Sequence, residues 1–264
     1  MIETAGFALV FITGLVMGMI GAGGSILTSS ILVYLFSINP VLPASYTLLN
    51  VGIISLVGVV QCFRKDQVDI KTGLLFAIPA LLMVFMMRRF IMPAIPATIF
   101  SCGTLAFTKD LMVMLIFALL MILISWSMIH QPVYRQPTEQ PEKHSKTMIL
   151  PGMLAGIVTG FTGAGGGFII VPALIFFTGL DIKKAVGTSL FIISINTAIG
   201  FMSDFSAGVT YDWSFLLKLV SITVAGMICS SALVGRISND RLKRLFGITI
   251  FVIGCWIIVL ELID

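Results

Sequence analysis

A glycine-rich segment occurs twice in this chain, and both copies lie inside apolar sequence. The first copy is residues 14–24 (GLVMGMIGAGG), and the second is residues 156–166 (GIVTGFTGAGG), which Gly167 continues. Seven of the eleven positions are identical at an offset of 142 residues. Adjacent glycines are costly inside a helix, so each copy predicts a break in an apolar segment. Neither copy fits the dinucleotide-binding pattern, because Ile26 and Phe168 stand where its third glycine is needed.

Composition places the duplicated segment in a membrane. Hydrophobic residues make up 58% of the 264, charged residues make up only 11%, and the mean hydropathy is +1.10. So few charges cannot cover a soluble globular surface, and apolar stretches of spanning length fill nearly the whole chain. The net charge of +4 needs no acidic partner such as nucleic acid, since an inside-positive bias explains it. We therefore expect a multi-pass protein of the plasma or inner cell membrane.

The chain divides into two repeats around one polar segment. Residues 1–129 form the first repeat, residues 130–147 form a polar linker that we expect to be cytoplasmic, and residues 148–264 form the second repeat. Each repeat contains four apolar elements. In order these are 5–36, 43–63, 70–87 and 110–129, then 148–178, 185–205, 213–234 and 242–263.

The quality of the repeat alignment falls along the chain. Beyond the glycine segments, Leu48 aligns with Leu190 and Gly58 aligns with Gly200. Similarity then fades, although residues 110–117 still align with 240–246 after a small shift. The first element of each repeat is broken by its glycines, and prolines (Pro93 and Pro96) interrupt the connection before residue 109.

The distribution of positive charge favours a hairpin for each broken element. If each broken element crossed the membrane once, the 16 Lys and Arg would divide seven against nine. If each entered and returned, with glycine at the tip, they would divide twelve against four, which the positive-inside rule prefers. The twelve are Arg64, Lys65, Lys71, Arg135, Lys143, Lys146, Lys183, Lys184, Arg236, Arg241, Lys243 and Arg244. Three full spans plus a hairpin per repeat predict an all-α fold with inverted pseudo-symmetry, an architecture of transporters.

The hairpin tips are the predicted anion-binding sites. Irregular backbone at membrane depth must be buried in protein or line a cavity. Each tip opens a short half-helix whose N–H groups and positive dipole end suit an anion, and glycine permits close approach. The predicted residues are Gly21, Gly23, Gly24 and Ser25 at the first tip and Gly163, Gly165, Gly166 and Gly167 at the second. Carbonyls at the ends of the preceding arms are an alternative site for a coupling cation.

The helix after each hairpin adds a polar face. Thr47 and Asn50 lie one turn apart, and Ser189 and Asn196 lie two turns apart. These hydroxyls and amides are candidates to complete the shell around an oxyanion, while ordinary interhelical hydrogen bonding remains the alternative. We expect a simpler role, close helix packing, for the G-x-x-x-G pairs Gly14/Gly18 and Gly156/Gly160.

No metal or cofactor is expected. The four cysteines (Cys62, Cys102, Cys229 and Cys255) form no C-x-x-C pair, and the two histidines (His130 and His144) fall in the polar linker. An intramembrane enzyme would need a histidine cluster, an acid pair or a nucleophile with its base, and the sequence supplies none of these sets.

The two glycine segments, together with the run Ala185-Val186-Gly187-Thr188-Ser189-Leu190 and Pro172, resemble the sulfite exporter TauE/SafE family of permeases. The resemblance covers essentially the whole chain and adds Thr188 to the candidate residues. Two positions depart from it, because Ser30 stands where the second copy has Pro172 and Tyr46 stands where it has Thr188.

The resemblance implies a permease for small sulfur-containing anions such as sulfite, thiosulfate or organosulfonates. We expect a secondary transporter that works by alternating access, with a possible coupling ion (a proton or sodium). The alternative is a cation carrier or channel that uses the tip carbonyls.

Overall fold

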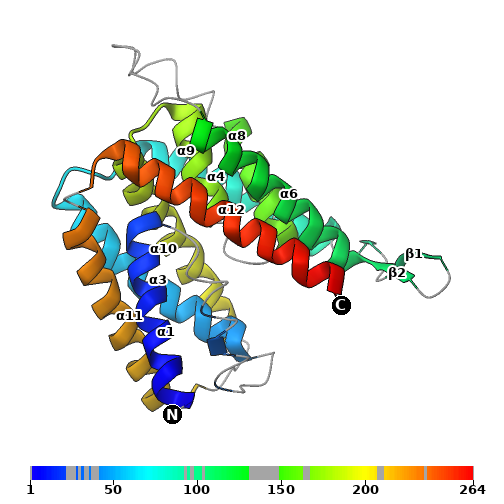
Figure 1. The fold of residues 1–264 in the computed structure, drawn as a ribbon, viewed down its shortest axis with the longest axis horizontal. Helices are drawn as coiled ribbons and strands as arrows, with labels where there is room; N and C mark the ends of the chain where they lie inside the picture. Colours follow the sequence, from blue (N-terminus) through cyan, green and yellow to red (C-terminus); the bar gives the residue numbers. More distant parts are fainter. Residues whose placement is uncertain are drawn as a thin grey trace.

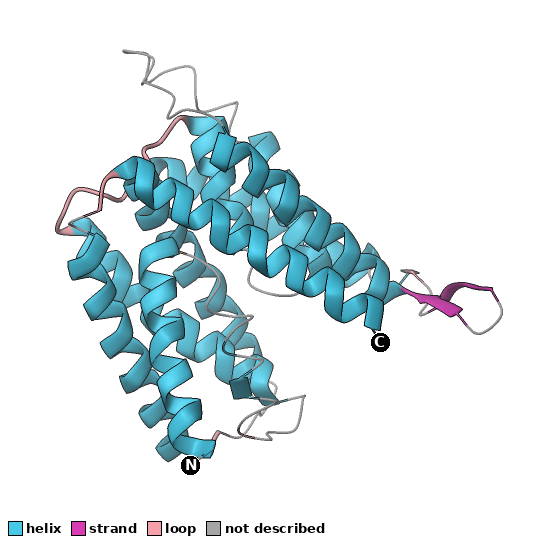
Figure 2. Ribbon diagram, viewed as in Figure 1, coloured by secondary structure: helices cyan, strands magenta, loops and turns pink. Residues whose placement is uncertain are grey.

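The computed structural model describes residues 2–21, 28, 31–32, 36, 42–91, 94–95, 98–102, 105–130, 149–162, 167–206, 211–234 and 237–263. Helices dominate this part of the chain (Figure 2). The first repeat contains α1 (Ile2–Ile20), α3 (Leu42–Phe63), α4 (Ile70–Met86), the π-helical turn η1 (Met87–Ile91) and α6 (Lys109–His130). The second repeat contains α8 (Ile149–Thr162), α9 (Gly167–Thr178), α10 (Ile182–Ser206), α11 (Trp213–Val234) and α12 (Asn239–Ile263).

One short sheet interrupts the helical architecture. Strands β1 (Thr98–Cys102) and β2 (Leu105–Thr108) pair in antiparallel fashion between η1 and α6. The connection that contains Pro93 and Pro96 lies between the end of η1 at Ile91 and the start of β1 at Thr98, and both prolines lie outside the described residues. The strand pairing was not expected, because residues 98–108 show no clear alternation of apolar and polar side chains.

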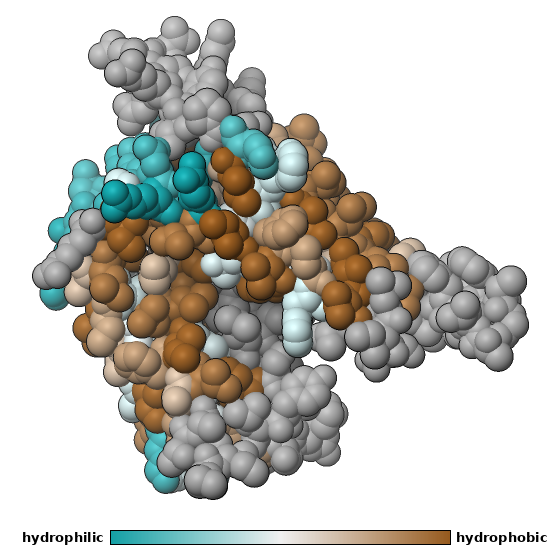
Figure 3. Space-filling model, in the orientation of Figure 1, coloured by the Kyte–Doolittle hydropathy of each residue, from teal (hydrophilic) through white to brown (hydrophobic). Residues whose placement is uncertain are grey.

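The described helices have the length and surface of membrane-spanning segments. Four apolar stretches are long enough to cross a bilayer: Tyr46–Phe63, Ile182–Met202, Trp213–Val234 and Asn239–Val259. Large apolar side chains face outward along them, including Met202 at 72% exposure and Trp256 at 64%. Figure 3 shows this apolar surface over the helices, with hydrophilic residues gathered at one end. The protein is therefore a multi-pass membrane protein.

The helices form two groups that each contain elements of both repeats (Figure 1). In one group α1 lies along α11 and α3 lies along α10, while in the other α8 lies along α4 and α6 lies along α12. The first helix of each repeat thus packs against the third element of the other repeat. Each repeat therefore needs the third element of the other repeat to bury its own first helix.

The G-x-x-x-G glycines make these exchanged contacts, which confirms their predicted packing role. A Cβ on Gly14 would collide with the Thr223 carbonyl oxygen of α11, and a Cβ on Gly156 would collide with the Ala80 carbonyl oxygen of α4. One turn later, a Cβ on Gly160 would lie 2.6 Å from Met87 Cβ. Both helix pairs run parallel, since the contacted residue numbers rise together.

The central pair, α3 and α10, runs antiparallel, and equivalent residues of the two helices make equivalent contacts. A Cβ on Gly200 would lie 3.3 Å from Leu48 Cδ1, and a Cβ on Gly58 would lie 2.8 Å from Leu190 Cδ1. The repeat alignment pairs Leu48 with Leu190 and Gly58 with Gly200, so exchanging the repeats turns one contact into the other. This reciprocity supports the alignment of the second elements.

The start and the end of the first broken element lie side by side. Phe36 and Phe7 have ring centroids 5.2 Å apart, and a Cβ on Gly6 would lie 2.7 Å from Phe36 Cζ. A single crossing would place these residues on opposite faces of a hydrocarbon core about 30 Å thick. Their contact is the geometry that a hairpin requires.

The loops that the hairpin topology assigns to one side also lie together. We call this the cationic end: loops 64–69 and 179–181 and the first turn of α12, which meet at the upper left of Figure 1. Lys65 and Lys183 line one pocket there. The single-crossing topology would separate these two lysines by the membrane.

Candidate functional site

Gly21 ends α1 in a conformation that favours glycine. Its φ is +69°, and its N–H donates to the Met17 carbonyl over 2.7 Å, which closes the last turn of the helix. This left-handed residue after a helix is a common C-terminal cap. The residue is buried, so the helix break predicted from the glycine segment lies in the protein interior.

The cap of α1 is held by the second repeat. Ser189 Oγ of α10 donates to the Gly21 carbonyl at 2.7 Å and lies 2.8 Å from the Val186 carbonyl oxygen. A Cβ on Gly21 would lie 2.7 Å from Val186 Cγ1 and 2.9 Å from Ser189 Oγ. Any side chain at position 21 would therefore disturb both the backbone and this contact. The structure brings together two of the predicted residues, Gly21 and Ser189.

At the second tip the structure describes only Gly167, which is buried and begins α9. The remaining tip residues predicted from the sequence lie outside the described residues; they are Gly23, Gly24, Ser25, Gly163, Gly165 and Gly166. Their proposed contact with an anion stays a prediction.

Asn50 is a fully buried amide with incomplete hydrogen bonding. Its Oδ1 lies 3.2 Å from Thr223 Oγ1 of α11, and that hydroxyl also lies 2.6 Å from the Leu219 carbonyl oxygen. A hydroxyl has one proton, so if it donates to Leu219 the amide must turn to donate to Thr223. In either orientation one polar end of Asn50 has no partner within the described chain. An unpaired amide of this kind is costly unless a ligand or water satisfies it.

Thr47 shares this feature. It is buried one turn before Asn50 on α3, and its Oγ1 has no hydrogen-bond partner among the described residues. Asn196 of α10 likewise has a buried Oδ1 without a described partner. Each predicted polar residue with an unpaired atom lies on α3 or α10, the antiparallel pair that joins the repeats.

Thr188 has a structural partner. Its Oγ1 accepts a hydrogen bond of 3.0 Å from the main-chain N–H of Asp69, the N-cap residue of α4. Tyr46, its counterpart in the first repeat, does the same, because its hydroxyl accepts from the N–H of Asp212 at 2.7 Å. The sequence departure at these positions therefore preserves one hydrogen bond.

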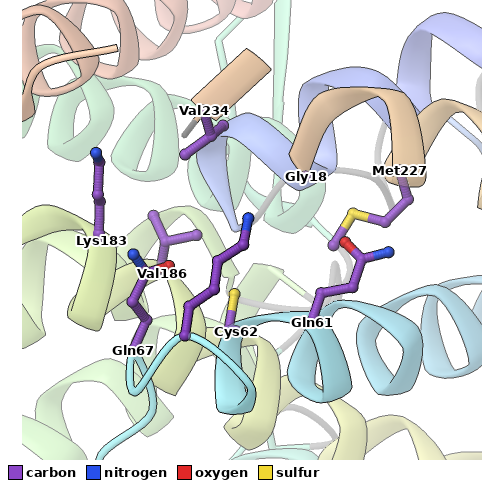
Figure 4. Close-up of a pocket in the computed structure, with 9 residues that line it drawn as sticks. Gly18, Gln61, Cys62, Gln67, Lys183, Val186, Met227 and Val234 are labelled. Carbon is purple, nitrogen blue, oxygen red and sulfur yellow. The ribbon is translucent and has the colours of Figure 1, made fainter. Parts of the chain in front are cut away.

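A pocket at the cationic end was not predicted from the sequence. Figure 4 shows side chains from four segments of the chain around it. The lining residues are Gly18, Gln61, Cys62, Lys65, Gln67, Lys183, Val186, Met227 and Val234. The lysines were used only to assign topology, and the pairing of loop 64–69 with the start of α10 is a tertiary contact with no local signal.

Within the residues that the structure describes, no group of three or more His, Cys, Asp or Glu side chains is close enough to hold a metal ion. The described candidate residues are instead hydroxyls, amides and glycine backbone. Such groups bind small ions and polar solutes without a metal.

Comparison with known proteins identifies relatives over nearly the whole chain. Residues 6–257 match the protein-family model described as "Sulfite exporter TauE/SafE". A probable membrane transporter protein of Xylella fastidiosa (strain 9a5c) is 25% identical over 256 residues, which is 94% of this chain and 91% of the relative. YunE, a probable membrane transporter protein of Bacillus subtilis (strain 168), is 24% identical over 283 residues, 96% of this chain and 97% of the relative. No solved structure matches the chain significantly.

Proposed function

The chain belongs to the sulfite exporter TauE/SafE family of membrane transporters, and on this basis we propose that it is a secondary transporter of small sulfur-containing oxyanions. Sulfite, thiosulfate and organosulfonates are the proposed substrates. The proposed binding region lies between the two hairpin tips, beside α3 and α10.

The observation that carries this proposal is the junction of Gly21 with α10. A helix break in the protein interior is capped by a hydroxyl from the other repeat, and unpaired polar atoms occur on the two central helices. A sulfur oxyanion needs several N–H or O–H donors around its oxygens. Glycine backbone, hydroxyls and amides supply donors without the cost of burying a Lys or Arg in the membrane.

We further propose that the repeats are inverted. In this proposal they rock against each other and so expose the binding region alternately to the two sides of the membrane. The antiparallel contacts of the equivalent helices α3 and α10 support this, since equivalent helices run in opposite directions only when the repeats are inverted. Helices α6 and α12 also run antiparallel, because Gly247 contacts Ile129 and Gly254 contacts Ile122. In this arrangement the cationic end is cytoplasmic by the positive-inside rule.

A cation carrier is the second candidate, and one observation favours it. The carbonyl of Gly21 lies at the negative dipole end of α1, in the interior, where carbonyl oxygens suit a coupling cation. Ser189 donates to that carbonyl in the structure, which occupies one of its lone pairs.

Flux measurements on purified protein in liposomes separate the two candidates. We expect saturable uptake of radiolabelled thiosulfate or sulfite, with competition by organosulfonates and none by chloride. Protein-free liposomes provide the background. Cation-selective current without anion flux would reject the oxyanion transporter and favour the cation carrier.

A further inference from the structure

The pocket at the cationic end extends from the loop after α3 to Gly18 of α1, one turn before Gly21. Its outer wall comes from the loop after α3 and the start of α10, which contribute Lys65, Gln67 and Lys183. Its inner wall comes from Gly18 of α1 and Val186 of α10. Val186 is also the residue that a side chain at Gly21 would strike. Val186 thus has one contact in the pocket and another at Gly21, the first residue of the predicted tip.

The polar lining of this pocket suits an anion. Two lysines (Lys65 and Lys183) and two glutamines (Gln61 and Gln67) are among its lining residues, and none of the lining residues is an Asp or Glu. Carboxylates do occur nearby at Asp66, Asp69 and Asp181, but Asp69 is engaged in capping α4 through Thr72. The buried Oε1 position of Gln61 has no partner among the described residues. Because amide oxygen and nitrogen are assigned from hydrogen bonding, a rotated Gln61 would present its NH₂ group to an anion.

The two pocket lysines have no lysine at the equivalent positions of the other repeat. At the 142-residue offset, Lys65 corresponds to Ala207 and Lys183 corresponds to Val41. Cys62 corresponds to Asp204, which adds a negative charge to the sequence of the equivalent segment. The two repeats thus share their helices and glycines, but only one of the two equivalent sets of positions carries the pocket lysines.

Building on the proposed transport function, we propose that this pocket is the mouth through which oxyanions are recruited from the cationic end, with Lys65 and Lys183 as its specificity-determining charges. Clefts lined by one sign of charge concentrate ions of the opposite sign. The recruitment is therefore kinetically one-sided: the transporter saturates at a lower anion concentration from the cationic end than from the opposite end.

Cys62 provides a direct probe, because it lines the pocket beside the lysines. Replacing Cys102, Cys229 and Cys255 with Ala leaves Cys62 as the single cysteine of the four. Its modification rate is then measured with an anionic reagent (2-sulfonatoethyl methanethiosulfonate) and with a cationic one (2-trimethylammonioethyl methanethiosulfonate). The ratio of the two rates reports the local electrostatic potential, whether or not the protein transports anything.

We expect Lys65→Ala with Lys183→Ala to lower the anionic-to-cationic rate ratio by about tenfold or more at low ionic strength, and salt to reduce the difference. The control is Lys184→Ala with Lys71→Ala, which removes two exposed lysines of the same end that do not line the pocket. This control should leave the ratio close to that of the parent. An unchanged ratio in the pocket variant, or no reaction at Cys62 with either reagent, would overturn the inference.

Transport measurements connect the mouth to the proposed function. In oriented proteoliposomes the pocket variant should raise the thiosulfate KM about tenfold from the cationic end, with kcat and the opposite-end KM retained. Thiosulfate should also slow modification of Cys62. If the parent protein neither binds nor moves thiosulfate, the proposed function fails; if it does so with the same KM in the pocket variant, only the mouth assignment fails.

Discussion

The main-chain N–H of Asp212 donates a hydrogen bond to the Tyr46 hydroxyl at 2.7 Å. Its counterpart joins the N–H of Asp69 to Thr188 Oγ1 at 3.0 Å. In both cases a hydroxyl on the second element of one repeat holds the aspartate that caps the third element of the other, since Asp69 accepts from Thr72 N and Asp212 accepts from Phe215 N. The two repeats are thus joined by two equivalent hydrogen bonds that different side chains make.

These paired bonds predict matched losses of stability. Tyr46→Phe and Thr188→Val each remove the acceptor for a partly buried N–H, and each should lower the free energy of unfolding by about 1–3 kcal/mol. The losses should be nearly additive, because the two sites have no shared partner. Thermal unfolding in detergent measures both. Thr197→Val is the control, since its hydroxyl bonds to the Ile193 and Ser194 carbonyls of its own helix, α10; an equal loss there would show that the interrepeat bonds have no special weight.

Gly21→Ala tests the first tip. A left-handed conformation costs a residue with a Cβ about 1–2 kcal/mol, and the added methyl group would also strike Val186. We expect the protein to fold and enter the membrane with transport reduced at least tenfold. Gly179→Ala is a matched control, because Gly179 has φ +68° but no heavy atom within 4 Å of an added Cβ. Similar transport in the two variants would remove Gly21 from the site.

Ser189→Ala tests the hydroxyl that reaches from α10 to Gly21. Loss of this bond should destabilise the protein by about 1 kcal/mol and raise the apparent Kd for thiosulfate. Ser194→Ala removes a hydroxyl that bonds to the Phe191 carbonyl of the same helix, and it should leave the Kd unchanged. Calorimetric titration with thiosulfate compares the two, and identical affinities would limit Ser189 to a packing role.

Asn50→Leu distinguishes a binding amide from a structural one by the sign of its effect on stability. Replacing an incompletely bonded buried amide with an apolar side chain should keep or raise the thermal stability, while a ligand-binding role predicts loss of oxyanion affinity. Ser55→Ala is the comparison, because its buried hydroxyl also lacks a described partner and lies on another face of α3. A variant at Asn50 that is less stable but binds normally would contradict the binding role.

Much of the architecture was predictable from the sequence because it depends on local and repeated signals. Apolar length located the helices, and the duplicated glycines located the breaks and the close contacts of Gly14 and Gly156. The contact between Phe7 and Phe36 agrees with the hairpin that charge parity predicts. Hydropathy, glycine clusters and cationic loops can each be recognised within a single segment of the chain.

What the sequence did not reveal depends on pairings between distant segments. The alignment of the two repeats faded after the second element. In the structure, however, Gly14 contacts Thr223 and the equivalent Gly156 contacts Ala80, so Thr223 and Ala80 occupy equivalent positions at an offset of 143 residues. Similarly, Tyr46 and Thr188 look unrelated until their bonds to Asp212 and Asp69 are seen. The pocket at Lys65 and Lys183 combines residues more than 100 positions apart, so no window along the chain contains it.

Thiosulfate counterflow in proteoliposomes tests the central proposal most directly. Liposomes loaded with unlabelled thiosulfate should accumulate external labelled thiosulfate transiently when they contain the wild-type protein or Gly179→Ala, but not Gly21→Ala. Such accumulation requires a carrier whose binding site alternates between the two sides. The absence of accumulation by the folded wild-type protein with thiosulfate, sulfite and organosulfonates would contradict a sulfur-oxyanion transporter.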